Sequence, residues 1–190
     1  MFLLSLLAAG ASLVPAPAAD TACVVQNPQR MPAEGRPSPL DSLTFGVGEH
    51  RVKVCYGRPS LRGRNMIGGP AVPYGKLWRT GANEPTIFYT PVKLTVAGIA
   101  VAPGLYSLYT VPGEKEWEII VNRATAQWGH ESRYTDEVKR QEVGRGKAPA
   151  EPMAAPVETF TIRAEPGSGG GQSLLLEWET TRVRIPVKAG

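Results

Sequence analysis

Apolar side chains recur at every second position in several short runs of this chain, and this alternation constrains the fold more than any other feature. Side chains of a β-strand point alternately to its two faces, so a period of two predicts strands with one buried face. A helical period is not sustained anywhere, and the best helix candidate is a short one around Ser132 to Val138. The clearest alternating runs are Leu43-Phe45-Val47, Val52-Val54-Tyr56 and Val92-Leu94-Val96.

Turn-forming residues separate these runs. Gly48-Glu49 divides the first two runs into a hairpin, and the pairs Ala97-Gly98, Pro103-Gly104 and Pro112-Gly113 mark further turns. The last third holds "VETFTIRAE", a flexible "PGSGGGQ", and "SLLLEWETTRVRIPVK", which we interpret as a closing hairpin. We therefore predict an all-β fold: an antiparallel β-sandwich, or a partly open barrel, of about nine to eleven short strands with one long ordered loop.

The N-terminal segment differs in composition from the rest of the chain. Residues 1–19 form an apolar run followed by small residues, which is typical of a signal peptide, although the first cation is Arg30. Residues 20–40 are irregular and proline-rich, and we expect residues 41–190 to form a single β-sandwich domain. The apolar run is too short to span a membrane as a mature helix. We expect a protein exported to the periplasm or the extracellular space, with no transmembrane segment in the mature chain.

The chain has two cysteines, Cys23 and Cys55. A disulfide between them fits an exported protein, and by loop-entropy arguments it would stabilise the fold by about 4 kcal/mol. Two alternatives stay open. Cys23 could carry a lipid anchor, which Asp20 disfavours because an aliphatic residue is expected there, and Cys55 could be a buried thiol.

Several common chemistries lack their sequence signals. The run Gly167–Gly171 is not followed by Lys-Ser/Thr or by a helix, so we interpret it as a loop and not as a phosphate site. His50 and His130 are the only histidines and have no ligand-like companions, so we expect no metal site and no cofactor. The net charge of +4 is too small to indicate nucleic acid as a partner. No G-x-S-x-G motif indicates a serine hydrolase.

Residues 56–86 carry the whole net charge. They contain five of the 21 basic residues and one of the 17 acidic residues, which leaves 16 of each elsewhere. Arginine forks bind carboxylate or phosphate, and aromatic faces stack on sugars or rings. We therefore predict that this loop binds a small anionic or carbohydrate-like ligand. The candidate ligand-binding residues are Arg58, Arg64, Tyr74, Lys76, Trp78, Arg79, Asn83 and Glu84.

Two other functions remain open for the same residues. In a hydrolase, Glu84 would be the general base and Arg79 would stabilise negative charge, with Glu118, Glu131 or Asp136 as a possible second acid. In a structural or assembly protein of the cell envelope, the loop would only fasten itself: Arg79 would pair with Glu84, Asn83 would cap the turn at Gly81-Ala82, and Trp78 would plug one end of the sandwich. Nothing in the sequence indicates the oligomeric state.

Five motifs support a family resemblance: "VKVCYGRPSLRGR", "VPYGKLWRTGANEPT", "PGLYSLYTVPG", "WEIIVN" and "WG". In this order they resemble the domain-of-unknown-function family 2911, over roughly residues 40 to 188. The resemblance implies an all-β, often exported bacterial protein. It assigns no activity, so no catalytic residue can be transferred. Cys55 and Pro85 depart from the expected pattern. The residues that match the family motif are Arg58, Arg64, Tyr74, Gly75, Lys76, Trp78, Arg79, Gly81, Asn83 and Glu84.

Overall fold

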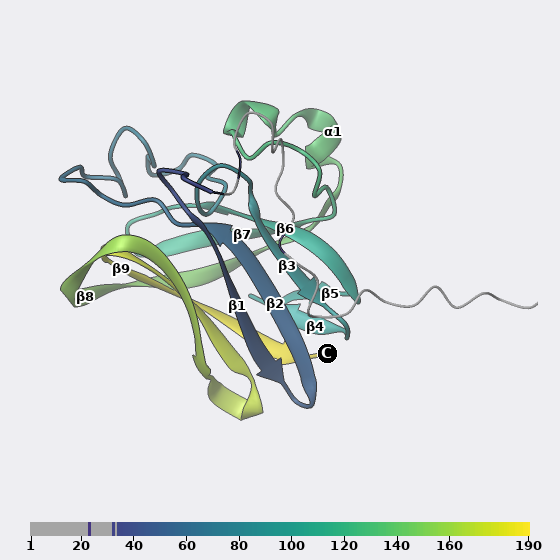
Figure 1. Ribbon diagram of the computed structural model, residues 1–190. Coiled ribbons are helices and arrows are strands. Elements are labelled where there is room, and N and C mark those ends of the chain that lie inside the picture. The colour runs from purple at the N-terminus through teal and green to yellow at the C-terminus, as the bar shows by residue number, and fades with distance from the viewer. Residues whose placement is uncertain (1–22, 24–31, 33) are drawn as a thin grey trace, which may run out of the picture.

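A computed structural model describes residue 23, residue 32 and residues 34–190 of the chain (Figure 1). The segment interpreted as a signal peptide and most of the proline-rich segment lie outside these residues. The described residues form nine strands, which confirms the all-β prediction. The strands are β1 (Leu40–Val47), β2 (His50–Gly57), β3 (Thr86–Thr90), β4 (Leu94–Val96), β5 (Ile99–Val101), β6 (Gly104–Val111), β7 (Glu116–Asn122), β8 (Glu142–Pro166) and β9 (Gln172–Ala189).

Short helical turns occur at two places in the described part of the chain. The first place holds η1 (Glu131–Arg133) and α1 (Asp136–Lys139), where the sequence predicts a short helix. Thr135 caps α1, because its side chain accepts a hydrogen bond from the backbone N–H of Val138. The second is η2 (Ser168–Gly170), which joins β8 to β9 and confirms that the glycine run is a connection.

The nine strands form one curled antiparallel sheet in the order β1-β2-β3-β6-β7-β8-β9-β4-β5. Strand β8 is 25 residues long and belongs to both halves of the sheet. Its residues 142–149 pair with β7, and its residues 150–166 pair with β9. The sheet therefore folds over at β8, so that β1 contacts β8 and β9 (Figure 1). The result is the sandwich or partly open barrel that the alternating pattern predicts.

The interpretation of residues 173–188 as a closing hairpin is wrong. These residues lie in one continuous strand, β9, and the hairpin is formed by β8 and β9 together. Glu179 has a φ of 52°, and the pairing register shifts opposite it. This bulge bends the strand without reversing it. The Glu179 carboxylate accepts hydrogen bonds of 2.9 and 2.8 Å from the backbone N–H groups of Met66 and Ile67, which fixes the bulge against the long loop.

The inward-facing side chains of the two layers form the core. Along β2, Val52, Val54 and Tyr56 all point inward and are buried, as their spacing predicts. Near Tyr56 the core is aromatic: the ring of Trp78 lies 5.9 Å from Trp117, 5.1 Å from Phe160 and 5.9 Å from Trp178. No helix among the described residues has the length and apolar character needed to cross a membrane.

Candidate functional site

The loop of residues 58–85 connects β2 to β3 and closes one end of the sandwich, which we call the loop end (Figure 1). Its backbone is hydrogen-bonded to neighbouring strands along its length. Trp78 exchanges two hydrogen bonds of 2.8 and 2.9 Å with Thr110, and the N–H of Gly75 donates to the carbonyl of Pro112 at 2.8 Å. The N–H of Leu61 donates to Glu158 at 2.9 Å. This long loop is therefore ordered by the sheet, as predicted.

Glu84 is bound by Arg36, a residue outside the predicted site. The Arg36 guanidinium donates to both carboxylate oxygens of Glu84 at 2.7 and 2.9 Å, and its Nε donates to the carbonyl of Pro32 at 2.7 Å. The two side chains are 0% and 4% exposed. Such a two-point contact is the strongest ion-pair geometry that arginine makes. The expected pairing of Arg79 with Glu84 is therefore wrong.

Arg79 pairs with Glu131 instead. Its Nε and Nη2 donate to the two carboxylate oxygens of Glu131 at 3.1 Å each, and its backbone N–H lies 3.3 Å from one of them. Glu131 begins η1. This pair therefore ties the loop to the segment that contains η1 and α1 and covers β6 and β7, which we call the covering segment. Glu118, another suggested second acid, pairs with Arg145 at 2.6 Å. Glu131 and Glu118 are therefore both engaged in ion pairs with arginines.

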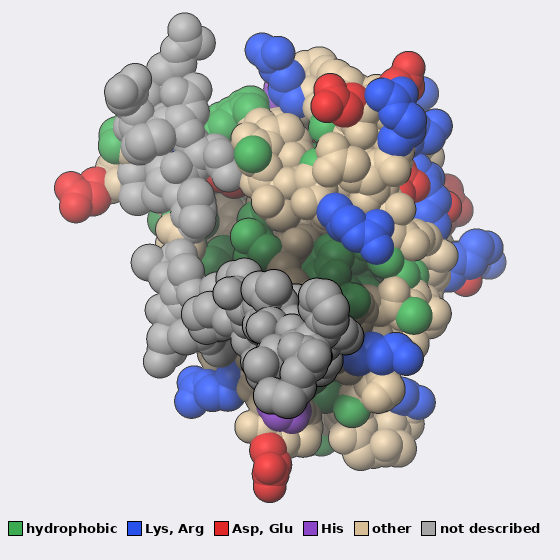
Figure 2. All heavy atoms as spheres, turned by 90° about the vertical axis from the view of Figure 1, so that its right-hand side faces the viewer, with side chains coloured by type: hydrophobic (Ala, Val, Ile, Leu, Met, Phe, Trp, Pro, Cys, Tyr) green, Lys and Arg blue, Asp and Glu red, His purple; other side chains and the backbone are tan. Residues whose placement is uncertain are grey.

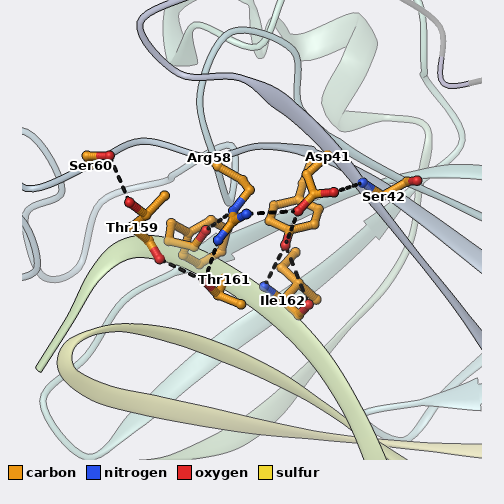
Figure 3. A network of polar contacts seen from close by, with 9 residues as sticks. Asp41, Ser42, Arg58, Ser60, Thr159, Thr161 and Ile162 are labelled. Carbon is orange, nitrogen blue, oxygen red and sulfur yellow. Dashed lines mark hydrogen bonds and ion pairs between the residues drawn. The ribbon is translucent and has the colours of Figure 1, made fainter. Parts of the chain in front are cut away.

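Arg58 ties the end of β2 to β8 (Figure 3). Its guanidinium donates to the carbonyl of Phe160 at 3.2 Å and to the hydroxyl of Thr161 at 3.0 Å, and it lies 3.2 Å from the carboxylate of Asp41. The hydroxyl of Tyr56, beside it, accepts a hydrogen bond from the Ile162 N–H at 3.0 Å. Burial is the main cause that raises the pKa of Tyr56. Arg58 therefore serves as an internal fastener between the two layers.

The segment of residues 34–39, which we call the strap, lies along the loop and accepts its hydrogen bonds. The Arg62 guanidinium donates to the carbonyl of Pro37 at 2.8 Å, and the Asn83 amide donates to that of Ser38 at 3.1 Å. Arg62 and Asn83 have φ values of 51° and 66°, a left-handed conformation in which asparagine is favoured. Asn83 thus holds the strap, and does not cap the turn at Gly81-Ala82.

The glycine of the "WG" motif, Gly129, packs against the same place. A Cβ atom added at Gly129 would lie 2.6 Å from the carbonyl carbon of Glu84 and 2.7 Å from the nitrogen of Pro85. Only a residue without a side chain allows this approach. The motif therefore brings the covering segment onto the backbone that presents Glu84.

Three predicted site residues remain on the surface: Arg64, Tyr74 and Lys76. Arg64 donates only to the carbonyls of its own loop, at 2.9 Å to Leu61 and 3.0 Å to Ser60. Tyr74 is 43% exposed, and within the described part of the chain neither Arg64 nor Lys76 pairs with an acid. Trp78, by contrast, is buried in the aromatic cluster, so its ring has no face open to a ligand.

The disulfide between Cys23 and Cys55 is present, with the two Cα atoms 5.7 Å apart. It attaches the N-terminal segment to β2, and it is compatible with an exported protein.

A second polar cluster lies where the covering segment meets the start of β8. The hydroxyl of Tyr134 donates to Glu142 at 2.7 Å, and Arg145 donates two hydrogen bonds to the same carboxylate. The Arg145 hydrogen bonds are the main cause that lowers the pKa of Glu142, whereas burial raises the pKa of Tyr134. Within residues 23, 32 and 34–190, no group of three or more His, Cys, Asp or Glu side chains could hold a metal ion. The hydrogen bonds of this cluster hold the covering segment in place.

The opposite end of the sandwich, where Gly48-Glu49 joins β1 to β2, contains an apolar recess between the layers. We call this the hairpin end. The recess is small, with a cavity volume of about 20 Å³, which is room for about one water molecule. Figure 2 shows hydrophobic side chains in the middle of the face it draws, with Lys and Arg side chains near them. The residues that line the recess are Phe45, Val52, Val54, Phe88, Leu94, Val96, Leu108, Leu174 and Val187.

Sequence reasoning missed this recess and Arg36. Alternation shows that the lining side chains point inward, but it does not show whether the space between the layers is filled. Arg36 precedes the first strand by only a few residues, in a proline-rich segment with no periodic signal.

Comparison with known proteins places the chain in a family. A family model described as "Protein of unknown function (DUF2911)" matches residues 38–187, which include every strand except the last two residues of β9. No curated protein and no solved structure matches the chain. The match confirms the resemblance that the five motifs indicate, and the chain belongs to the DUF2911 family.

Proposed function

We propose that this protein binds a small anionic ligand at the exposed part of the loop, through Arg64, Tyr74 and Lys76. One observation supports the proposal: all three side chains are exposed, and among the described residues neither cation pairs with an acid. In keeping with the disulfide, we propose that this binding takes place outside the cytoplasm.

The chemistry of these side chains selects the ligand. A guanidinium and an ammonium group attract a carboxylate or a phosphate, and the exposed ring of Tyr74 offers a face to a sugar or another ring. The apolar recess at the hairpin end offers no alternative site, because a cavity of about 20 Å³ is far too small for a hydrocarbon chain.

Thermal-shift measurements on the full chain with phosphates, carboxylates and sugars test the proposal. A shift in the parent that is lost in Arg64→Gln with Lys76→Gln supports it. A shift that survives in this double variant points to another site, and no shift with any of the compounds contradicts the proposal.

The hydrolase interpretation has less support. Glu84 could act as a general base only if Arg36 left its carboxylate, since the pair is buried and bonded at two points. The internal contacts of Arg58, Trp78, Arg79, Asn83 and Glu84 are what an architectural role for these five residues requires. We therefore propose that these five residues form the framework that closes the loop end, and that the ligand binds the exposed side chains of the same loop.

A further inference from the structure

Strand β1 presents a long free edge of the sheet. Among the residues that the structure describes, β1 pairs only with β2, and it is the first strand in the order of the sheet (Figure 1). The strand at the other end of that order, β5, has three residues, whereas β1 has eight. Natural sheets protect their edges by keeping edge strands short, or by placing Lys, Pro or a bulge on them. The short β5 is protected in this way, and β1 is not protected by its length.

Two hydrogen bonds show which backbone groups of β1 face the free side. Just before the strand, the N–H of Arg58 donates to the carbonyl of Pro39 at 2.9 Å. Hydrogen-bonded residues alternate along an antiparallel strand, so the odd-numbered residues of β1 bond to β2. The N–H of Ser42 agrees with this alternation, because it donates at 2.7 Å to the carboxylate of its own neighbour, Asp41. The residues whose N–H and C=O groups face the free side are Ser42, Thr44 and Gly46.

The side chains of these three residues lie on the outer face of the sheet. Phe45 and Val47 point into the core, so the even-numbered side chains point outward. Ser42 and Gly46 are exposed, and a Cβ atom added at Gly46 would meet only a backbone oxygen, at 3.8 Å. The outer row of β1 therefore holds no charged residue, no proline and no bulky side chain that would keep another strand away.

Strand β1 meets the opposite layer through side chains. Near the loop end, the Arg58 guanidinium lies 3.2 Å from the carboxylate of Asp41 and donates to the hydroxyl of Thr161 at 3.0 Å (Figure 3). This contact lies at the first residues of β1. It does not use the outward backbone groups of Thr44 and Gly46, which stay available for a neighbouring strand.

From this free edge we infer that two copies of the protein pair through β1, antiparallel and with two-fold symmetry about Thr44. In this register Thr44 lies opposite the same residue of the second copy, and Ser42 lies opposite Gly46, so each of these pairs exchanges two hydrogen bonds. On the inner face, Leu43 lies opposite Phe45. Small side chains thus meet small ones outside, and apolar side chains meet apolar ones inside, as an interface with two identical halves requires.

The charge of the edge favours a second copy over a charged peptide. Two copies meet without like-charge repulsion because the outer row of β1 is uncharged, whereas an acidic or a basic strand finds no countercharge in that row. Leu43, which is half-buried, gains cover from Phe45 of the second copy. A strand of eight residues buries less surface than the standard interface of about 1,600 Å², so the dimer is weak and depends on concentration. The inference does not depend on the anionic ligand.

Sedimentation velocity of the full-length protein tests the pairing. The concentration series extends to about 1 mM, so that dissociation constants of that size are measured. Thr44→Pro removes the central outward donor, and it leaves the bonds between β1 and β2 in place because the Thr44 N–H faces away from β2. Thr44→Val keeps the N–H and is the control. We expect the parent and Thr44→Val to form dimers of similar affinity, and at least a tenfold weaker dimer in Thr44→Pro.

A pair of charge variants tests the two-fold symmetry about Thr44. Thr44→Lys alone and Thr44→Glu alone each place like charges opposite one another across the interface, which should weaken the dimer by up to about fivefold. An equal mixture of the two should restore the affinity of the parent, because a lysine then faces a glutamate. The Thr44 side chain lies on the outer face, so both variants should fold, and their melting temperatures check this.

Three outcomes would contradict the inference. The first is a parent that stays monomeric over the whole concentration series. The second is a dimer that persists unchanged in Thr44→Pro, which would place the contact elsewhere on the molecule. The third is a mixture of the charge variants that associates no better than either variant alone, since the two strands would then not meet at Thr44.

Discussion

The two ends of the sandwich differ in how the space between the same strands is filled. At the loop end the space between the layers is filled by the cluster of Trp78, Trp117, Trp178 and Phe160, and a long loop lies over it. At the hairpin end the inward-facing side chains are aliphatic or Phe, and a recess remains. Along β2, the environment changes between two residues that face the same way. Val54 lines the recess, whereas the ring of Tyr56 lies 5.8 Å from that of Phe160.

The charges of the two ends differ in the same way. The loop carries the net positive charge of the sequence, yet its central arginine, Arg79, meets a carboxylate supplied by Glu131 from another segment. Its single acid, Glu84, meets Arg36 of the strap. Charge that looks unbalanced along the sequence is thus partly balanced in space. Arg64 and Lys76 of the loop, by contrast, have no paired acid among the described residues.

The largest effect should come from breaking the pair at the loop end. Glu84→Gln removes the carboxylate that the buried Arg36 guanidinium binds at two points, and loss of one partner of a buried pair costs about 3–5 kcal/mol of the free energy of unfolding. Urea unfolding of the parent and the variant measures this loss. The matched control is Glu131→Gln, since its pair with Arg79 is 31% and 19% exposed. We expect a loss of about 1 kcal/mol or less there.

Replacing both partners sharpens the same comparison. Arg36→Met combined with Glu84→Leu removes the buried charges together, so it should retain more stability than Glu84→Gln alone. A double variant that is less stable than the single one would show that the contacts of the strap, and not charge burial, dominate the effect.

The disulfide should give the second largest effect. Cys55→Ser frees the N-terminal segment from β2, and loss of a bridge of this loop length costs about 2–4 kcal/mol. Cys23→Ser should lose the same amount, and the double variant should lose no more, because one bond is removed in all three. Dithiothreitol should bring the parent to the melting temperature of the variants and leave theirs unchanged. A residual effect of dithiothreitol on Cys55→Ser would contradict this account.

The fold was largely predictable because its signals are local. Alternation and turn pairs define β1, β2 and the turns between β4 and β7, since each depends on residues that are neighbours in sequence. The lengths of β8 and β9 were not predictable. Pro152 and Glu179 resemble strand breaks in sequence, but register shifts in the β8–β9 pair absorb them, and only the pairing of two distant segments reveals this.

The site was less predictable because its contacts are distant. Arg79 and Glu84 are five residues apart, so an ion pair between them is the simplest hypothesis from the sequence. Arg36 lies 48 residues before Glu84, and only the path of the strap brings them together. Trp78 is predicted as a ligand-binding residue and, in the structural alternative, as a plug for one end of the sandwich; its burial agrees with the plug. Whether its ring also offered a face to a ligand depended on Trp117, Trp178 and Phe160, which no local pattern connects to it.

Packing density tests the contrast between the two ends directly. Val187→Ile adds one methylene group beside the recess, which has room for it, and should stabilise the fold by up to about 1 kcal/mol. Val183→Ile adds the same group to a filled part of the core and should destabilise by about 1 kcal/mol or more. Urea unfolding of the two variants measures the difference. Equal losses in both would show that the recess has no usable space.

The smallest effects should come from the exposed cations of the loop, and they decide what the family motif does. Arg64 bonds only to carbonyls of its own loop, and Lys76 is exposed, so Arg64→Gln and Lys76→Gln should each change the free energy of unfolding by no more than about 0.5 kcal/mol. Arg79→Gln, which leaves Glu131 without its two-point partner, should cost more. This order would divide the motif into residues that fasten the loop and residues whose charge the fold does not need. If Arg64→Gln instead cost as much stability as Arg79→Gln, the whole basic loop would serve to close the sandwich. The binding of an anionic ligand by this loop would then lose its support.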